Sequence, residues 1–174
     1  MANVDNPHGL TPLCRTTDGG EVRVEEYTKD SSGGNIFIHD VVTRETDGNI
    51  TATGTTPGTT VWEGVTLNYS ATGVAGTHLV IINPNAQYVA QDNNDSEGFV
   101  TADQGLNANI ELNAGSSTSF ISGHEIDEST WNTTNTLDVK LHGLWPNPNN
   151  AYGPNADIIV SINKSRFGNA TTGA

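Results

Sequence analysis

Hydrophobic residues in this chain recur at every second position in short runs, and nowhere at the spacing of a long helix. The clearest runs are Leu137 to Leu144 and Asp157 to Asn163. A period of two places the hydrophobic side chains on one face of a strand, so Asp138, Lys140 and His142 are expected to face solvent. No window of 11 or more residues has an apolar stripe with a period of 3.6 residues. The pattern predicts a fold built from β-strands.

The segment between these two runs indicates how they pair. Residues 145–154 read Trp-Pro-Asn-Pro-Asn-Asn-Ala-Tyr-Gly-Pro. Proline fixes φ and lacks a backbone donor, and Asn and Gly tolerate turn geometry, so no helix is expected here. A parallel connection normally needs a helical crossover, and the two strands are therefore predicted to pair antiparallel.

Further strand candidates are separated by turns rich in Gly, Ser, Asn and Pro. They are Glu21 to Tyr27, Ile36 to Val42, Ile50 to Thr53, Val61 to Tyr69, His78 to Asn83, Gln87 to Gln91, Phe99 to Thr101, Ala108 to Leu112 and Ser119 to Ser122. Helical turns are expected only as short pieces, at Ala102 to Leu106 and Asp127 to Trp131. Many short strands with closely spaced turns predict an all-β fold, an antiparallel β-sandwich or barrel-like domain.

The chain divides into three parts by composition. Residues 1–20 show no sustained period and contain Pro7, Gly9, Pro12 and a Gly19-Gly20 pair, which predicts an extended N-terminal arm outside the core. Residues 21–166 are expected to form a single β-rich domain, as the length of 174 residues suggests. Residues 167–174 are small and polar and are predicted to be a flexible C-terminal tail.

The charge and the cysteine content limit the partners. The 20 acidic residues exceed the 7 Lys and Arg residues and give a net charge of −13, which repels nucleic acid and anionic lipids. No stretch approaches the ~18 consecutive apolar residues of a membrane span, and no export signal is readable. Cys14 is the single cysteine, so no disulfide within the chain is expected and a reducing cytoplasm is the expected site of synthesis.

No catalytic residue, cofactor site or metal site is predicted. Ser122 to Asp127 holds a histidine and two carboxylates but lacks the second histidine of a zinc-binding helix, and it is interpreted as a loop. Asp92 to Gly98 is rich in oxygen ligands, yet Glu97 stands where a calcium-binding EF-hand loop has glycine, so a solvated acidic turn is expected. Gly-x-Ser-x-Gly and P-loop motifs are absent, and the five histidines are scattered.

The order of several short motifs resembles that of small capsid decoration or cement proteins of tailed bacteriophages. The motifs are the opening Met1 to Pro12 followed by Arg15, Asn83-Pro-Asn-Ala-Gln-Tyr-Val-Ala-Gln91, Ser122-Gly-His-Glu-Ile-Asp127, and the two strands and Pro-Asn loop of Leu137 to Asn163. Their order and spacing match over most of the chain. The chain departs from the pattern at Trp145 and its flanking prolines, where charged residues are more usual, and Thr46 to Thr77 has no counterpart.

The resemblance implies a non-enzymatic virion structural protein, synthesised in the host bacterial cytoplasm, that binds the outer surface of the capsid and stabilises it. The implied partners are the major capsid protein and further copies of the chain, as a dimer or trimer. The expected partner contacts are Pro7, Gly9, Leu10, Pro12, Trp145 and Tyr152. The alternative is a carbohydrate- or receptor-binding β-module, such as a head-fibre or adhesin domain, that uses Trp145 and Tyr152 as a stacking surface.

Overall fold

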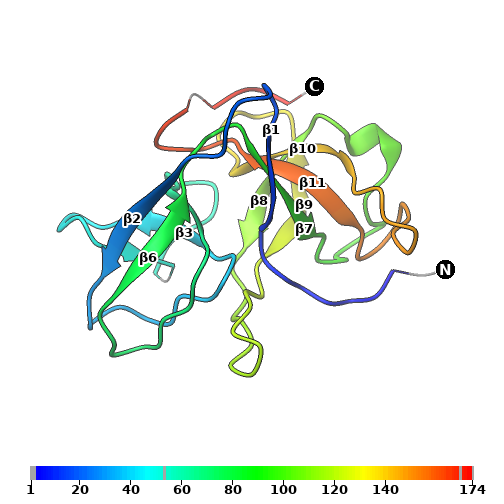
Figure 1. The fold of residues 1–174 in the computed structure, drawn as a ribbon. Helices are drawn as coiled ribbons and strands as arrows, with labels where there is room; N and C mark the ends of the chain where they lie inside the picture. Colours follow the sequence, from blue (N-terminus) through cyan, green and yellow to red (C-terminus); the bar gives the residue numbers. More distant parts are fainter. Residues whose placement is uncertain (1–2, 53, 169, 174) are drawn as a thin grey trace.

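The chain folds into two antiparallel β-sheets, as the alternating pattern predicts. The computed structural model describes residues 3–52, 54–168 and 170–173, and Figure 1 shows the two sheets as two halves of the molecule. The elements are β1 (Thr11–Thr16), β2 (Val24–Lys29), β3 (Val41–Arg44), β4 (Ile50–Thr51), β5 (Gly64–Thr66), β6 (Gly76–Ile81), β7 (Ala86–Gln91), a 3-10 helical turn η1 (Thr101–Asp103), β8 (Asn107–Glu111), β9 (Glu125–Asn132), β10 (Val139–Leu144) and β11 (Asp157–Ile162).

The strands are ordered β1-β7-β11-β10-β8-β9 in the larger sheet and β2-β6-β5-β3-β4 in the smaller one. Every pair of neighbours within the two sheets is antiparallel. The predicted pair on either side of the Pro-Asn loop is confirmed, because β10 pairs with β11 with Leu141 opposite Val160.

One hydrophobic core joins the two sheets. Val41, Trp62, Val65 and Ile81 from the smaller sheet and its flanking residues belong to the same buried cluster as the inward residues of β7, β8, β10 and β11. A second cluster lies inside the curved smaller sheet, around Val42, Val80 and their neighbours. Because the larger cluster includes residues of both sheets, the two sheets pack as one body.

Three local expectations are wrong. Asp127 to Trp131 is part of the eight-residue strand β9, in which Ile126 is fully buried opposite Ile110 of β8. Phe99 to Thr101 and Ser119 to Ser122 form no strand, although Phe99 and Ile121 each make an isolated bridge. Within the described part of the chain, η1 is the one helical segment, and it overlaps the turn expected from Ala102.

The expectation of an N-terminal arm outside the core is wrong for residues 10–16. Residues 3–9 form no strand, but β1 pairs with β7 and Leu10 is fully buried in the core. β1 is thus the edge strand of the larger sheet, where Figure 1 shows it among the other strands. Cys14 has a φ of 52°, and the register shifts between Pro12 and Thr16. This bulge breaks the period of two and hides the strand in the sequence.

The C-terminal residues also lie against the sheet, which contradicts the predicted flexible tail. The backbone N–H of Thr171 donates to Asn163 Oδ1 at 2.8 Å, and Asn107 Nδ2 donates to the Thr171 carbonyl at 2.7 Å. The Gly173 N–H donates to the Thr133 carbonyl at 2.8 Å. These bonds hold Thr171 and Gly173 against the larger sheet and the loop that follows β9.

Candidate functional site

Gly9 and Leu10 offer no surface to a partner, so two of the expected contact residues are corrected. Both are buried, and the Leu10 N–H donates to the His39 carbonyl at 3.1 Å. Gly9 has a φ of 65°, and a Cβ there would lie 2.4 Å from the Ser122 Cβ. Glycine is required at this position, since only glycine combines the left-handed backbone with the close approach. Pro7 and Pro12 are half-buried.

The segment before Leu10 is held by polar side chains. Asn3 Nδ2 donates to the carbonyls of Ala151 and Pro154 at 2.8 and 2.9 Å. Gln91 accepts the Asn6 N–H at 2.7 Å and donates to the Val4 carbonyl at 2.9 Å. These contacts place residues 3–6 beside the loop that follows β10.

A chain of hydrogen-bonding side chains crosses this segment. His8 Nε2 lies 3.2 Å from Asp157 Oδ1, and His8 Nδ1 lies 3.0 Å from Thr11 Oγ1. Thr11 Oγ1 lies 3.2 Å from His39 Nδ1. Both ring nitrogens of His8 are engaged, and the four side chains link the N-terminal segment, β1, β11 and the loop before β3. The arrangement fastens these elements together. It could not be predicted from the sequence, because His39 and Asp157 are far from His8 and Thr11 in the chain.

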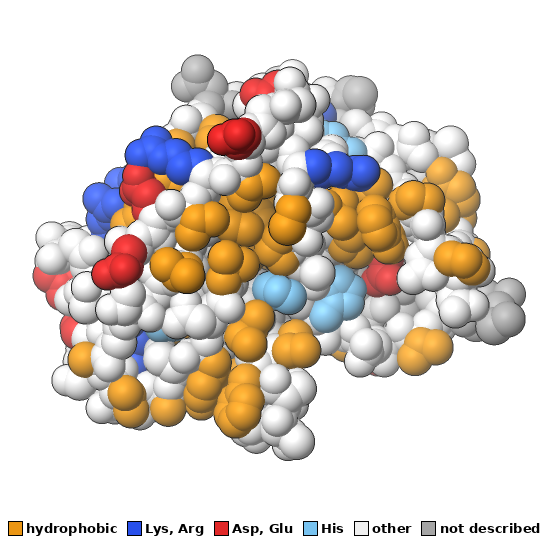
Figure 2. Space-filling model, viewed as in Figure 1, with side chains coloured by type: hydrophobic (Ala, Val, Ile, Leu, Met, Phe, Trp, Pro, Cys, Tyr) orange, Lys and Arg blue, Asp and Glu red, His pale blue; other side chains and the backbone are white. Residues whose placement is uncertain are grey.

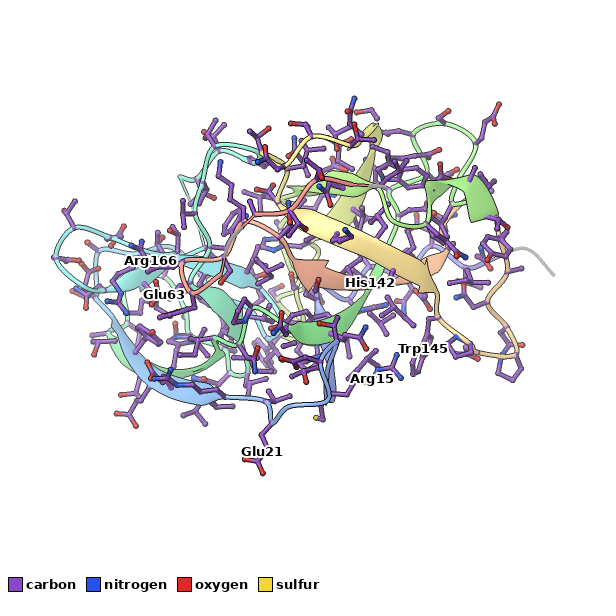
Figure 3. The ribbon with its side chains drawn as sticks, turned by 90° about the horizontal axis from the view of Figure 1, so that it is seen from above. Arg15, Glu21, Glu63, His142, Trp145 and Arg166 are labelled. Atoms are coloured by element: carbon purple, nitrogen blue, oxygen red, sulfur yellow. The ribbon has the colours of Figure 1, made fainter. Side chains whose placement is uncertain are left out.

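Trp145 and Tyr152 have separate neighbours. Trp145 is half-buried, and the Arg15 guanidinium carbon lies 6.0 Å from its ring centroid. Figure 3 shows Arg15 and Trp145 pointing toward one another. Tyr152 is exposed, stacks on Phe99 with ring centroids 5.9 Å apart, and its hydroxyl accepts a bond from Gln104 Nε2 at 2.7 Å. The Trp145 ring therefore presents less free surface than its place in the loop suggests.

The Ser122 to Asp127 segment contributes to a buried pair that joins the two sheets. His124 Nε2 lies 3.4 Å from Asp40 Oδ1, and His124 Nδ1 accepts the Val41 N–H at 3.4 Å. Asp40 Oδ2 accepts the Phe37 N–H at 2.8 Å. Burial lowers the pKa of His124 to about 4 and raises the pKa of Asp40 to about 6. Burial thus favours the neutral form of both groups.

Replacing Asp40 by Asn is expected to stabilise the protein above pH 6. The unfolded chain releases the Asp40 proton near 3.8 and the folded chain only near 6, so the wild-type protein loses stability as the pH rises between these values. An amide does not ionise and still offers an oxygen to His124 or to the Phe37 N–H. Urea unfolding should give a gain of up to about 3 kcal/mol at pH 7.5, and the two proteins should be equally stable at pH 4. An unchanged difference between pH 4 and 7.5 would contradict this assignment.

The expectation of a solvated acidic turn over Asp92 to Gly98 is wrong for its first residue. Asp92 is fully buried, and its carboxylate accepts the N–H groups of Asn94, Phe99, Asn155 and Ala156 at 2.8 to 3.2 Å. Burial raises the pKa of Asp92, and these four bonds oppose that effect. The carboxylate thus ties two loops together, and its oxygens are occupied by backbone donors.

Three carboxylates lie close together at turns of the smaller sheet. Ligand oxygens of Asp30, Glu45 and Asp47 all lie within 4.8 Å of one another, and Glu45 and Asp47 are exposed. Asp30 Oδ1 already accepts the N–H groups of Ser32 and Gly33, both at 2.8 Å. Burial and the charges of Asp47 and Asp30 raise the pKa of Glu45. These carboxylates stabilise two turns, and water solvates the exposed ones.

Hydrophobic side chains gather on one face of the molecule. Val24 of β2 and Leu79 of β6 are 43% and 47% exposed. The β2–β6 register places both on the face that carries Ile81, and Leu67, whose N–H donates to the Leu79 carbonyl, continues this face. Leu67 is partly buried against the core. We call Val24, Leu67 and Leu79 the apolar band.

Charged side chains lie beside the apolar band. Figure 2 shows hydrophobic side chains gathered in the middle of one face, with Lys, Arg and acidic side chains mostly above and beside them. Glu26 lies opposite Leu79 in the β2–β6 register. Arg23 pairs with Glu25 at the start of β2. A face of this composition can bury apolar area without burying many of the charges that make up the net −13.

Comparisons with known proteins give no relative. No family model, no curated protein and no solved structure matches this chain. In the residues that the structure describes, no helix is long and apolar enough to cross a membrane.

Proposed function

We propose that this chain is a non-enzymatic structural protein of a tailed-bacteriophage virion, one that binds the outer surface of the assembled capsid and reinforces it. The structural observation that supports the proposal is the apolar band, in which Val24 and Leu79 are 43% and 47% exposed on one sheet face. The motif order described above supplies the identity of the partner, the major capsid protein. A dimer or trimer of the chain on the capsid belongs to the same proposal.

The physical role would be to bridge capsid subunits. A protein placed across subunit junctions adds buried interface at contacts loaded by packaged DNA, and it does so many times in each particle. A ligand that binds only the assembled shell stabilises that shell by mass action. Attachment through the apolar band should be weakly sensitive to salt, because ionic strength screens exposed charges and leaves apolar contacts intact.

Charges placed in the apolar band should prevent attachment. The double substitution Val24→Asp and Leu79→Asp removes two side chains that each contribute about 1.5 kcal/mol when buried, which corresponds to a loss of affinity of roughly a hundredfold. Cosedimentation with capsids that lack the protein measures this directly. The matched control is Val74→Asp with Val100→Asp, two exposed valines outside the band, which add the same charge and should bind as the wild type does.

Three results would decide between the functions. Capsids without the protein should disrupt at a lower temperature, and adding it back at moderate salt should restore them. Equal robustness of the particles with and without it would refute the proposal. Binding of the purified chain to glycans, with no affinity for capsids, would instead favour the carbohydrate-binding alternative.

A further inference from the structure

A cavity lies on the outer face of the larger sheet. Its volume is about 350 Å³, and the residues that line it come from β10, β11, the turn before β7, the end of β1 and the C-terminal segment. Lys140 and His142 reach this face because they alternate along β10 with Val139 and Leu141, which are buried in the core. Ser161 of β11 and Asn85 also line the cavity.

The charge of this cavity is opposite to that of the protein. None of the described residues that line it is acidic, although acidic residues outnumber Lys and Arg by 20 to 7 in the whole chain. Lys140 lines the cavity, and both Lys140 and Arg15 act electrostatically on His142. Asp157 is engaged with His8 at 3.2 Å, whereas Asp18 accepts a bond at 2.8 Å from Nδ2 of Asn85, a lining residue, and so stands at the margin of the cavity.

Lys140 and His142 keep free hydrogen-bonding capacity in the cavity. Lys140 Nζ donates to the Thr172 carbonyl at 3.2 Å and makes no second hydrogen bond among the described residues. His142 Nε2 lies 2.8 Å from Ser161 Oγ, and its Nδ1 makes no hydrogen bond among the described residues. Burial, followed by the charges of Lys140 and Arg15, lowers the pKa of His142. The His142 imidazole is therefore held neutral by burial and by two nearby cations. An anion bound beside it would raise its pKa.

We infer that this cavity binds a small ligand through an oxyanion group, a carboxylate, phosphate or sulfate. Lys140 Nζ donates to the anion, Arg15 adds a second positive charge, and His142 takes up a proton when the anion binds. A volume of about 350 Å³ lies within the range of small-molecule sites, about 300 to 1,000 Å³. The site is separate from the apolar band, and the inference does not depend on the proposed function.

Nuclear magnetic resonance of the His142 ring tests the inference. The pKa of His142 is measured with sodium sulfate and with sodium chloride at equal ionic strength, because sulfate keeps its double charge over the whole range. We expect sulfate to raise the pKa by about one unit, which means roughly tenfold tighter binding to the protonated protein. Repeating the titration with acetate distinguishes recognition of a carboxylate from recognition of a tetrahedral anion.

Matched variants separate this site from general attraction of anions. Lys140→Gln should weaken sulfate binding by roughly tenfold or more, whereas Arg23→Gln, an exposed arginine on another element, should leave it unchanged. Thermal unfolding shows whether both variants remain folded, as expected for outward side chains. An unmoved pKa of His142, or equal losses in the two variants, would overturn the inference.

Discussion

A chain that begins at Thr17 is expected to lose most or all of its stability. The deletion removes Leu10, which is fully buried in the core, and the whole of β1. Loss of a buried leucine side chain alone costs about 2 to 5 kcal/mol, and loss of β1 also uncovers the edge of β7. Domains of this size are stable by about 5 to 15 kcal/mol in total. Urea unfolding followed by tryptophan fluorescence should show a large fall in the midpoint or no folded baseline.

A shorter deletion provides the control. Removing residues 1–6 eliminates the polar contacts of Asn3 and the bonds between Gln91 and the Asn6 N–H and Val4 carbonyl. Each such bond contributes about 1 kcal/mol in net terms, so this protein should remain folded with a modest loss. If the chain that begins at Thr17 were as stable as the full chain, residues 10–16 would contribute nothing to the core and would form an arm outside it.

The strands that could be predicted are those whose pairing leaves the sequence pattern intact. Leu137, Val139 and Leu141 keep the period of two before the register of β10 shifts between Leu141 and Gly143. No helix can cross the loop that follows, so both strands and their antiparallel pairing are readable. β1 could not be predicted. Between Pro12 and Thr16 the strand advances four residues while its partner β7 advances two, from Tyr88 to Ala86. The extra residues are accommodated by a bulge, and a bulge erases the period of two.

β9 could not be predicted from the sequence for a different reason. Its central residues, Asp127, Glu128 and Ser129, are polar and read as a helical turn or loop. Glu128 is nevertheless buried, because its carboxylate accepts the N–H groups of Ser96 and Gly98 at 2.9 and 2.7 Å. The residues that satisfy it lie in a distant loop, and a local pattern carries no information about such a partner.

The apolar band also could not be predicted from the sequence. Val24 and Leu79 lie on different strands, and only the pairing of β2 with β6 places them on one face. Each is a single exposed hydrophobic residue in the sequence and is unremarkable by itself. The loop of Trp145 attracted attention because its features are contiguous, yet part of that tryptophan is covered by Arg15, a contact between distant segments.

Asp138 is the clearest case in which a residue expected to face solvent holds the core together. It is fully buried just before β10. Its carboxylate accepts a bond from Trp62 Nε1 at 2.8 Å and from the N–H groups of Gly58 and Ile110 at 3.0 and 3.1 Å. Burial raises the pKa of Asp138, while these bonds and the charge of Lys164 act against the rise. The side chain therefore connects β8, the loop before β5 and the start of β10.

Replacing Asp138 by Ala is expected to lower the free energy of unfolding by roughly 4 kcal/mol. The change leaves two buried donors, Trp62 Nε1 and the Ile110 N–H, and the partly buried Gly58 N–H without an acceptor, and each buried one costs about 1 to 3 kcal/mol. The loss of stability in Asp138→Asn should lie between zero and that of Asp138→Ala. The amide oxygen can still accept one bond, while its NH₂ group faces another donor. Lys140→Ala, on the outward face of the same strand, is the control and should change stability by less than about 1 kcal/mol. Urea unfolding gives these values, and the fluorescence of the protein should also respond, since the buried indole of Trp62 loses its acceptor. Equal effects of Asp138→Ala and Lys140→Ala would mean that water or a shift of the backbone replaces the carboxylate, and the buried network would then contribute little to the fold.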